Sequence, residues 1–458
     1  MISWSPIFAP EGDDHPVEVC ESVTLAHTPF PNITYKLKNR QDVELSNLQR
    51  ETVRVAISAL QSYHVFALGD GTGVGKGRMI AGIIFEWLAT HPNSRVVWFS
   101  ANQRLKKQSY EELELMGLDV QDDRILFKSY IANSRFESNK EVKDHLGEGS
   151  NPLLICDECH LLRKQRALFE HLYKLTAMRP DISIMYSSAT MMSDPNHLLY
   201  LSKNFRIHSS HDAPFKDSIA LKEKLSSGGN AIMELVSMFL RSNGLLMCRQ
   251  LSLNDVTVEN VLIDMSVEKK KKYSTVANVL VEKNINVLTS QRLLMNLLTS
   301  FKIKKTIELA NKELSVGNFV IFIFTYTGEA AMERCIRKNQ KMPSSRIYDA
   351  IEEYDDGSVD VSSLDKNELD PIDKLIDYYG NEVVAEITGR SRRFVRNGDK
   401  WSIERINRTN ELSDFQNGKK RIAILSRAGG IGLSLHDNGH GKRVNFVIEL
   451  PWSSEDFV

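Results

Sequence analysis

Residues 65–78, with the sequence VFALGDGTGVGKGR, decide the fold class of this chain. The apolar run Val65 to Leu68 predicts a buried strand, and the run Gly77 to Ala89 after the glycines predicts a helix. A glycine loop between a strand and a helix favours a phosphate cradle over a flexible turn. Its backbone N–H groups can converge on phosphate oxygens, and the helix N-terminus adds partial positive charge.

The loop and its surroundings supply candidate ATP-binding residues. Lys76 would place a point charge beside the β- and γ-phosphates. Gln49, which precedes an amphipathic helix, is interpreted as an adenine-sensing glutamine, with an ordinary surface glutamine as an equal alternative. The predicted ATP-binding residues are Gln49, Gly71, Thr72, Gly73, Val74, Gly75, Lys76, Gly77 and Arg78.

Two positions depart from the usual loop pattern, which is GxxxxGK followed by Ser or Thr. Asp70 replaces the first glycine, and Gly77 stands where a hydroxyl normally holds Mg²⁺. Three explanations of the second departure stay open at this point. Water fills the coordination position, Thr72 or another group substitutes for the hydroxyl, or the magnesium site is weak.

Asp157 and Glu158 follow a second apolar run, Leu153 to Cys156, and open a D-E-x-H sequence that ends at His160. Adjacent acids at a strand end are often turn residues, but here they come after a phosphate loop in an α/β pattern. Asp157 would then hold Mg²⁺, and Glu158 would orient and deprotonate the attacking water. The predicted catalytic residues are Lys76, Asp157, Glu158 and His160, with Asp157 as the metal ligand.

Ser188, Ala189 and Thr190 follow a further predicted strand, Ile184 to Ser187. Small hydroxyl residues at a strand end usually form turns or helix caps. Here they come after the two other motifs, and their hydroxyls could hydrogen-bond His160. We therefore predict that they couple the nucleotide site to a neighbouring domain.

The composition is typical of a soluble globular protein, with 42% hydrophobic residues and a net charge of -1 from 59 acidic and 58 basic residues. Contact with nucleic acid would therefore need a local basic surface. Solvated helix charge is the commoner explanation of each basic run. The candidate clusters are Lys106 with Lys107, Lys269 to Lys272, Arg390 to Arg396 and Lys419 to Arg421.

The five cysteines give no disulfide framework, which fits a reducing compartment. Cys156, Cys159 and His160 do form the haem-attachment pattern CxxCH, but a strand and catalytic carboxylates explain these residues better. The N-terminus lacks a leader peptide, and no apolar run is long enough for a membrane span. We expect an intracellular, soluble protein without a membrane partner.

The chain as a whole predicts an α/β fold. Residues 41–213 alternate strand and helix patterns, as in a parallel sheet covered by helices, and residues 1–40 form an N-terminal extension. Residues 214–300 carry long amphipathic runs such as Ala231 to Asn243 and Val276 to Leu298, which predict a helical connector. A second α/β unit covers 301–458, with an exposed loop at Glu352 to Asp373. The predicted strands are Val65 to Leu68, Val96 to Ser100, Ile125 to Lys128, Leu153 to Cys156, Ile184 to Ser187, Phe319 to Phe324, Val383 to Ile387, Ile422 to Ser426 and Val444 to Leu450.

From about Leu45 to the end, the chain resembles the strawberry notch family of DExH-box, helicase-like ATPases in helicase superfamily 2. The family is related to the chromatin-remodelling translocases. Several stretches carry the resemblance in order and spacing. They are Gly69 to Arg78, Met233 to Leu235, Cys248 to Ser252, Thr327 to Ala330, Ala385 to Arg390, Gly432 to Leu435 and Glu449 to Ser453.

The resemblance implies two RecA-like P-loop NTPase lobes that close on ATP and Mg²⁺ and step along nucleic acid, with DNA favoured over RNA. It makes Gly77 a family feature and Gly432 a coupling residue. It also implies a C-terminally truncated second lobe, because the family continues with an arginine finger whose loss costs about a thousandfold in rate. The implied nucleic-acid contacts are Ser100, Arg104, Lys128, Tyr130 and Arg427.

The leading hypothesis is a translocase on duplex DNA that hydrolyses ATP. The resemblance points to transcription or chromatin proteins as partners, and to a nucleus or to a viral or bacterial nucleic-acid compartment. One alternative is a transcriptional cofactor or scaffold that binds ATP without turnover, which Gly77 and the missing arginines motivate. Another is a helicase that acts on RNA or on single strands.

Overall fold

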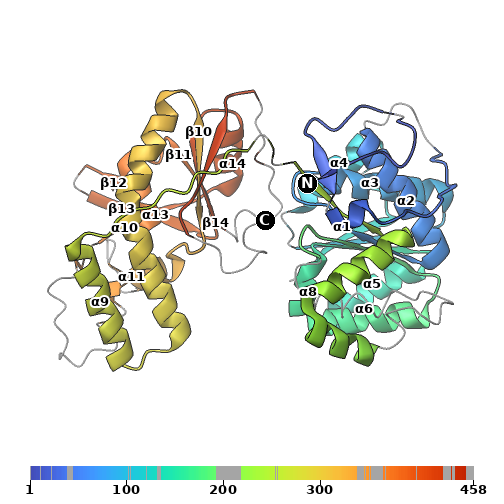
Figure 1. The fold of residues 1–458 in the computed structure, drawn as a ribbon, viewed down its shortest axis with the longest axis horizontal. Helices are drawn as coiled ribbons and strands as arrows, with labels where there is room; N and C mark the ends of the chain where they lie inside the picture. The colour runs from blue at the N-terminus through green and yellow to red at the C-terminus, as the bar shows by residue number, and fades with distance from the viewer. Residues whose placement is uncertain are drawn as a thin grey trace. The chain divides into compact units, whose positions relative to one another are not determined.

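The computed structural model divides the chain into two compact units, Met1–Thr257 and Val258–Phe457 (Figure 1). Each unit is described by itself. No helix among the described residues is long and apolar enough to cross a membrane. The structure describes residues 2–10, 12–21, 23–38, 45–101, 103, 105–119, 121–130, 136–191, 218–252, 254, 256–337, 345, 347–349, 351, 365–366, 368–398, 400–426, 435 and 439–449.

Unit 1 is built on a six-stranded parallel sheet with the strand order β5-β4-β6-β7-β3-β8. The central strands are continuous runs of buried residues, as expected for a sheet covered on both faces. All five strands that the sequence predicts in this unit are confirmed. The strands are β3 Val65–Leu68, β4 Val96–Ser100, β5 Ile125–Ser129, β6 Leu153–Asp157, β7 Ser183–Ser187 and β8 Leu246–Met247.

Helices cover both faces of this sheet. Figure 1 shows α2, α3 and α4 on one face and α5 and α6 on the other. Because the phosphate loop lies between β3 and α3, it occupies the edge of the sheet where the parallel strands end. The helices of unit 1 are α1 Val23–Ala26, α2 Asn47–Tyr63, α3 Lys76–Thr90, α4 Leu105–Leu115, α5 Phe136–Gly147, the 3-10 helix η1 Cys159–Lys164, α6 Arg166–Met178 and α8 Ser218–Ser242.

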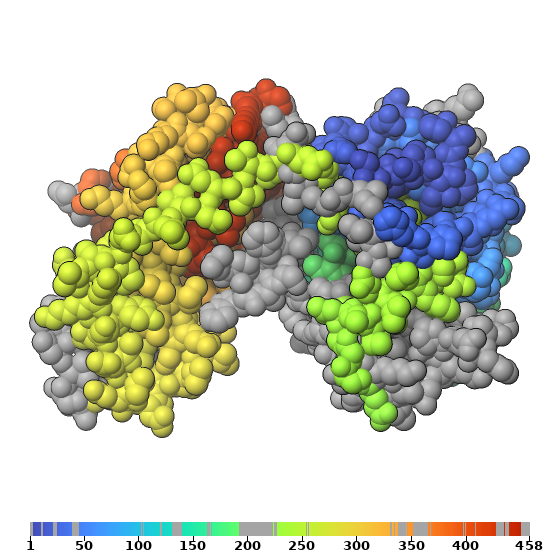
Figure 2. All heavy atoms as spheres, viewed as in Figure 1, coloured from blue at the N-terminus to red at the C-terminus, as the bar shows by residue number. Residues whose placement is uncertain are grey.

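The N-terminal residues belong to unit 1. Strands β1 Ile2–Ser3, β2 Val19–Glu21 and β9 Arg249–Leu251 form a small antiparallel sheet. The hydroxyl of Tyr35 donates to Glu86 on α3 at 2.5 Å. Figure 2 shows these residues, in dark blue, lying on the surface of unit 1. Where the structure describes it, the N-terminal extension predicted over residues 1–40 thus packs on the rest of unit 1.

The predicted connector, residues 214–300, is divided between the two units. Its first part contributes α8, β8 and β9 to unit 1, and its second part contributes α9 Val267–Glu282 and the start of α10 Val287–Ser315 to unit 2. The amphipathic run Val276 to Leu298 is helical but is divided between α9 and α10. The chain turns at Asn284, with a φ of 50°, and the Asn286 side chain then accepts the Thr289 N–H and caps α10.

Unit 2 contains a four-stranded parallel sheet with the order β11-β14-β10-β15 and an antiparallel hairpin of β12 and β13. The predicted α/β class with parallel sheets is thus confirmed. The predicted loop at Glu352 to Asp373 is corrected at its end, because α13 begins at Pro371, and most of the rest lies outside the described residues. The elements are β10 Phe319–Phe324, α11 Glu329–Arg337, α13 Pro371–Tyr379, β11 Val384–Ile387, β12 Arg392–Asn397, β13 Lys400–Arg405, α14 Arg408–Gln416, β14 Ile422–Ser426 and β15 Arg443–Val447.

Candidate functional site

The glycines of the phosphate loop are required by their conformation and by their neighbours. Gly73 and Gly75 have φ values of 85° and 95°, in the left-handed region that favours glycine. A Cβ on Gly75 would lie 2.7 Å from Nε2 of Gln49, and one on Gly73 would lie 2.8 Å from Cδ1 of Leu251. The loop therefore fits tightly between α2 and β9, and the side-chain amide of Gln49 lies beside Gly75.

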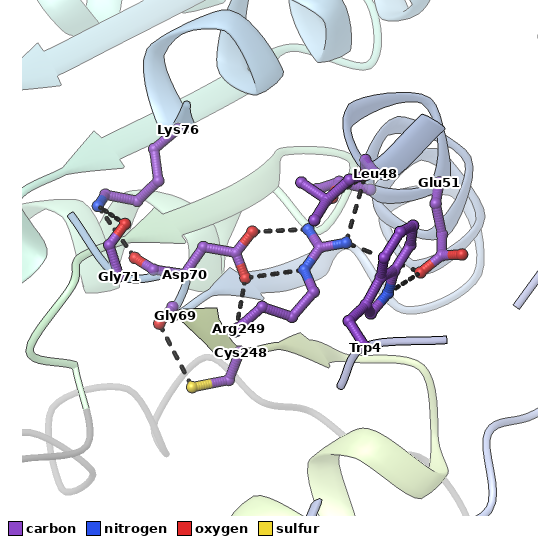
Figure 3. A network of polar contacts seen from close by, with 10 residues as sticks. Trp4, Leu48, Glu51, Gly69, Asp70, Gly71, Lys76, Cys248 and Arg249 are labelled. Atoms are coloured by element: carbon purple, nitrogen blue, oxygen red, sulfur yellow. Dashed lines mark hydrogen bonds and ion pairs between the residues drawn. The ribbon is translucent and has the colours of Figure 1, made fainter. Parts of the chain in front are cut away.

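Lys76 is the first residue of α3, and its side chain folds back over the loop (Figure 3). Its Nζ donates to the carbonyl oxygens of Asp70 and Gly71 at 2.9 and 3.2 Å. The ammonium group is thus held at the loop by two neutral acceptors. A phosphate oxygen would be a stronger acceptor for the same group, because both partners would be charged.

Asp157 ends β6, and hydroxyls at the ends of β4 and β5 hold it in place. The Ser100 hydroxyl, at the end of β4, donates to Oδ2 of Asp157 at 3.0 Å. The Tyr130 hydroxyl donates to the Asp157 carbonyl oxygen at 2.7 Å. Glu158 follows with a φ of 51°, which turns the chain sharply out of the sheet. The two carboxylates therefore come from a firmly positioned strand end.

The two acids share one environment, in which Lys76 is the positive charge that acts on both. Burial raises the pKa of Asp157, and the Ser100 hydroxyl and Lys76 act in the opposite direction. Burial and the neighbouring Asp157 raise the pKa of Glu158 to about 7, which Lys76 again opposes. Lys76 therefore acts on both acids, although they lie about 80 residues further along the chain.

This donor set fits Mg²⁺. A divalent cation prefers carboxylate oxygens and would stabilise the ionised form of the partly buried Asp157. No group of three or more acidic, histidine or cysteine side chains that could form a full metal cage is found in the part of the chain that the structure describes. Mg²⁺ commonly keeps several waters and binds through one or two carboxylates together with substrate phosphates, which matches this sparse set.

Gly77 leaves open space where the missing hydroxyl would stand. A Cβ at this position would meet only Cγ of Glu112, at 3.7 Å, which is ordinary contact. The next residue, Arg78, forms an ion pair with Glu112 of α4, so its guanidinium is engaged between two helices. Nothing steric therefore excludes a serine at position 77.

The hydrogen bond predicted for His160 is present. Its Nδ1 lies 3.0 Å from the Ser188 hydroxyl oxygen, which also accepts the backbone N–H of Thr190 at 3.1 Å. A carboxylate oxygen of Glu158 lies 3.4 Å from the same ring nitrogen. The Glu158 carboxylate and the predicted coupling residues, with Ala189 between the two hydroxyls, are thus linked through one imidazole.

The implied nucleic-acid contacts need correction. Ser100 and Tyr130 are buried, at 0% and 1% exposure, and both donate to Asp157, so they position the acid instead of facing nucleic acid. Tyr130 also stacks on Phe99 with its ring centroid 5.9 Å away. Lys128 forms an ion pair with Glu141. The remaining predicted residues, Arg104, Arg427 and Gly432, lie outside the described residues.

Several side chains of the basic clusters are buried in ion pairs, which differs from the solvated helix charge of the commoner explanation. Arg390 is buried and binds Glu386 and Asp373. Arg393 binds Glu411, which also binds the buried Lys420. Several of the other basic side chains are also engaged. Lys107 pairs with Glu111, Lys269 donates to the Phe301 carbonyl, Lys272 pairs with Glu368, and Arg421 donates to the carbonyls of Leu314 and Asn318.

Sequence reasoning missed Arg249, which is buried against the phosphate loop and binds Asp70. The only signal in the sequence was Asp70 itself, an acid at a glycine position. Its partner lies 179 residues later, so local pattern could not identify it.

Two family models match the chain. One is described as "P-loop containing NTP hydrolase pore-1" and matches residues 14–143 and 122–275. The other is described as "C-terminal domain on Strawberry notch homologue" and matches residues 370–458. The first covers more than half of the chain and includes the phosphate loop and both acids.

Curated relatives point the same way. Mouse strawberry notch homolog 2 is 24% identical, over 97% of this chain and 46% of the mouse protein. FORGETTER 1 of Arabidopsis thaliana is 26% identical, over 71% of this chain and 30% of that protein. The chain thus spans about half or less of these relatives. Among solved structures, this chain is similar to a Sulfolobus solfataricus SWI2/SNF2 ATPase core in complex with dsDNA. The two share 13% sequence identity and a TM-score of 0.37, and the match covers 88% of this chain and 82% of the Sulfolobus chain.

Proposed function

The chain belongs to the strawberry notch family of helicase-like P-loop NTPases, and from this premise we propose that it is a nucleic-acid-stimulated ATPase that translocates on duplex DNA. The observation that carries the proposal is the meeting of Lys76 with Asp157 and Glu158 at one sheet edge. The charge of Lys76 acts on both carboxyl groups, which are partly buried and held at a strand end. Such an arrangement suits hydrolysis of a nucleoside triphosphate.

The roles follow from the chemistry of the side chains. Lys76 would leave the loop carbonyls and bind the β- and γ-phosphates, while Gln49 would contact the base beside Gly75. Asp157 would hold Mg²⁺ together with water, and the bound ion would neutralise charge on the transferring phosphate. Glu158 would orient and deprotonate the attacking water.

Coupling to a moving strand would pass through His160. The imidazole bridges Glu158 and Ser188, so a shift of residues 188–190 would move the group beside the catalytic base. The family match over residues 370–458 supports a nucleic acid as the track. Resemblance to the chromatin-remodelling translocases favours duplex DNA, and with it transcription or chromatin proteins as partners in a nucleus or a viral or bacterial nucleic-acid compartment.

Turnover of ATP by the 458-residue chain, with and without duplex DNA, tests the proposal. We expect DNA to raise turnover, and Glu158→Gln to lower it by about 100-fold or more while ATP still binds. The matched control is Glu86→Gln, a buried glutamate of α3 that accepts hydrogen bonds from Tyr35 and from the Lys38 N–H, and it should turn over ATP like the wild type. Equal turnover in the wild type and Glu158→Gln would sink the proposal.

A second candidate function is a scaffold that binds ATP without turnover. Gly77 favours it, because the residue that normally contributes a magnesium hydroxyl has no side chain. ATP binding without measurable hydrolysis in a chain extended past Val458, with or without DNA, would support the scaffold. Stimulation by RNA or by single strands alone would instead support a helicase of that specificity.

A further inference from the structure

Asp70 and Arg249 form an ion pair that is fully enclosed in unit 1 (Figure 3). Asp70 Oδ2 accepts from Nη2 of Arg249 at 2.6 Å, and Oδ1 accepts from Nε at 3.2 Å. The backbone N–H of Arg249 adds a third bond to Oδ1 at 2.8 Å. The exposed fractions are 0% for Asp70 and 1% for Arg249. The guanidinium therefore binds the carboxylate through two nitrogens, and both groups are buried away from solvent.

The same guanidinium joins the loop to α2. Its Nη1 donates to the Leu48 carbonyl at 3.3 Å and lies 3.7 Å from Glu51, and its Nη2 donates to the Thr52 hydroxyl. Glu51 in turn accepts the indole N–H of Trp4 at 3.2 Å. Arg249 thus fixes the distance between the phosphate loop and the helix that carries Gln49.

The backbone around Arg249 holds the first half of the loop. The N–H groups of Ala67, Gly69 and Gly71 donate to the carbonyl oxygens of residues 245, 247 and 249 at 2.8, 2.7 and 2.6 Å. The loop therefore continues the pairing of β3 as far as Gly71. Because these N–H groups are already used, the phosphate-facing donors must come from the later half of the loop, which ends at Lys76.

Asp70 lies between Arg249 and Lys76. Its side chain is bound by the arginine, while its carbonyl oxygen accepts the lysine Nζ at 2.9 Å. A buried ion pair adds little net stability compared with an apolar pair of similar volume, because desolvation of two charges offsets their attraction. Glycine, the usual residue here, would cost no desolvation. The pair therefore calls for a role other than stability.

We propose that Arg249 is a positioning residue of the nucleotide site, which acts through Asp70 to hold the phosphate loop and Lys76 in the geometry that binds a nucleoside diphosphate moiety. The inference rests on the proposed function, since it deepens the role of the same site. Arg249 belongs to β9, the last strand of unit 1 before unit 2 begins at residue 258.

The test measures binding of a fluorescent ADP, mant-ADP, to the 458-residue chain and to its Arg249→Lys variant. Lysine keeps the positive charge but cannot bind the Asp70 carboxylate through two nitrogens. We expect the Kd to rise by about tenfold to 100-fold, the range that a misplacement of about 1 Å produces. A urea unfolding curve on each variant establishes that the protein measured is folded.

Arg241→Lys is the matched control. Arg241 forms a buried ion pair with Glu21 at 2.7 Å in the same unit, between α8 and β2. A purely structural role for Arg249 predicts that the two lysine variants lose stability alike and bind mant-ADP alike. A positioning role predicts that only Arg249→Lys loses affinity. Equal affinity of folded Arg249→Lys and the wild type would overturn the inference and leave the proposed function standing.

The neutral double variant Asp70→Asn with Arg249→Gln keeps the test decisive if the lysine variant does not fold, because it removes both charges of the Asp70–Arg249 pair and leaves Glu51 its hydrogen bonds from Trp4 and Ile7. Weaker mant-ADP binding by about tenfold supports the inference, and wild-type affinity overturns it. If the wild-type chain itself binds no mant-ADP, the proposed function fails and the inference falls with it. The two failures are thus distinguishable.

Discussion

The two parallel sheets differ most where strands β3 and β10 end. In unit 1, β3 runs into a glycine loop over which Lys76 Nζ donates to two carbonyl oxygens. In unit 2, β10 ends at Phe324, and the next two backbone N–H groups, of Thr325 and Tyr326, donate to the Glu449 carboxylate at 2.7 and 3.2 Å. The end of β3 thus presents a lysine that could bind an anion. The end of β10 is already occupied by the Glu449 carboxylate of the same chain.

Glu449 is well suited to fill this position. It is 3% exposed, and Thr299 of α10 donates a further hydrogen bond to its Oε1 at 3.0 Å. Burial raises the pKa of this carboxyl, and the N–H and hydroxyl donors act in the opposite direction. A phosphate at the end of β10 would have to displace a satisfied carboxylate. Similar sheets therefore do not imply similar sites, because the loops decide what binds.

The sharpest test of this difference uses one glycine from each loop. Gly75→Ala would force a left-handed φ on alanine and push its Cβ to 2.7 Å from Gln49. We expect mant-ADP affinity to fall by about 100-fold, because the loop and Lys76 would shift. The measurement is a fluorescence titration of the variant and the wild type.

Gly328→Ala is the matched control in unit 2. Gly328 also has a positive φ, 73°, and its Cβ would lie 2.7 Å from Oδ2 of Asp370. The strain should cost about 1–2 kcal/mol of stability, as in unit 1, but leave mant-ADP affinity unchanged. Equal losses of mant-ADP affinity in Gly75→Ala and Gly328→Ala would contradict the proposed difference between the two strand ends.

A second prediction concerns the Glu449 carboxylate, which occupies the end of β10 in unit 2. Glu449→Gln replaces one acceptor oxygen by an NH₂ group that faces a donor, so it should lower the free energy of unfolding by about 1–3 kcal/mol. Urea unfolding measures this loss, and mant-ADP binding should stay at the wild-type level. Stability equal to that of the wild type would show that the three hydrogen bonds contribute little.

The smallest effect is expected at Gly77. Because a Cβ fits there, Gly77→Ser should add a hydroxyl near the magnesium position without displacing Glu112. We expect the Mg²⁺ concentration for half-maximal ATP binding to fall by about fivefold, as about 1 kcal/mol of added ligand energy implies. Gly77→Ala controls for the added Cβ. No difference between the serine and alanine variants would mean that position 77 does not contact the ion.

The apolar runs of the sequence predicted most strands of the unit 1 sheet. Strands such as Val96–Ser100 and Leu153–Asp157 are continuous buried runs, so their apolar sequence is enough to identify them. Strand β8, Leu246–Met247, was missed because its two residues are defined only by pairing with β3. The order of the motifs also predicted which strand ends carry Lys76 and the acids.

The misassigned residues depended on distant neighbours. Tyr130 follows a strand and carries a hydroxyl, which suits a surface contact, but Phe99 and Asp157 of neighbouring strands bury it. Arg393 belongs to a basic run, yet it is paired with Glu411, which lies 18 residues later. Exposure and ion pairing are tertiary properties, so composition and spacing could not supply them.

The most direct measurement is the stoichiometry of ADP binding by titration calorimetry on the wild type, Lys76→Ala and Lys302→Ala. Lys302 is the unit 2 counterpart, since its Nζ donates to the Ile448 carbonyl just after β15 at 2.7 Å. The account predicts one ADP per chain, lost in Lys76→Ala and retained in Lys302→Ala. A second bound ADP, or wild-type affinity in Lys76→Ala, would contradict it.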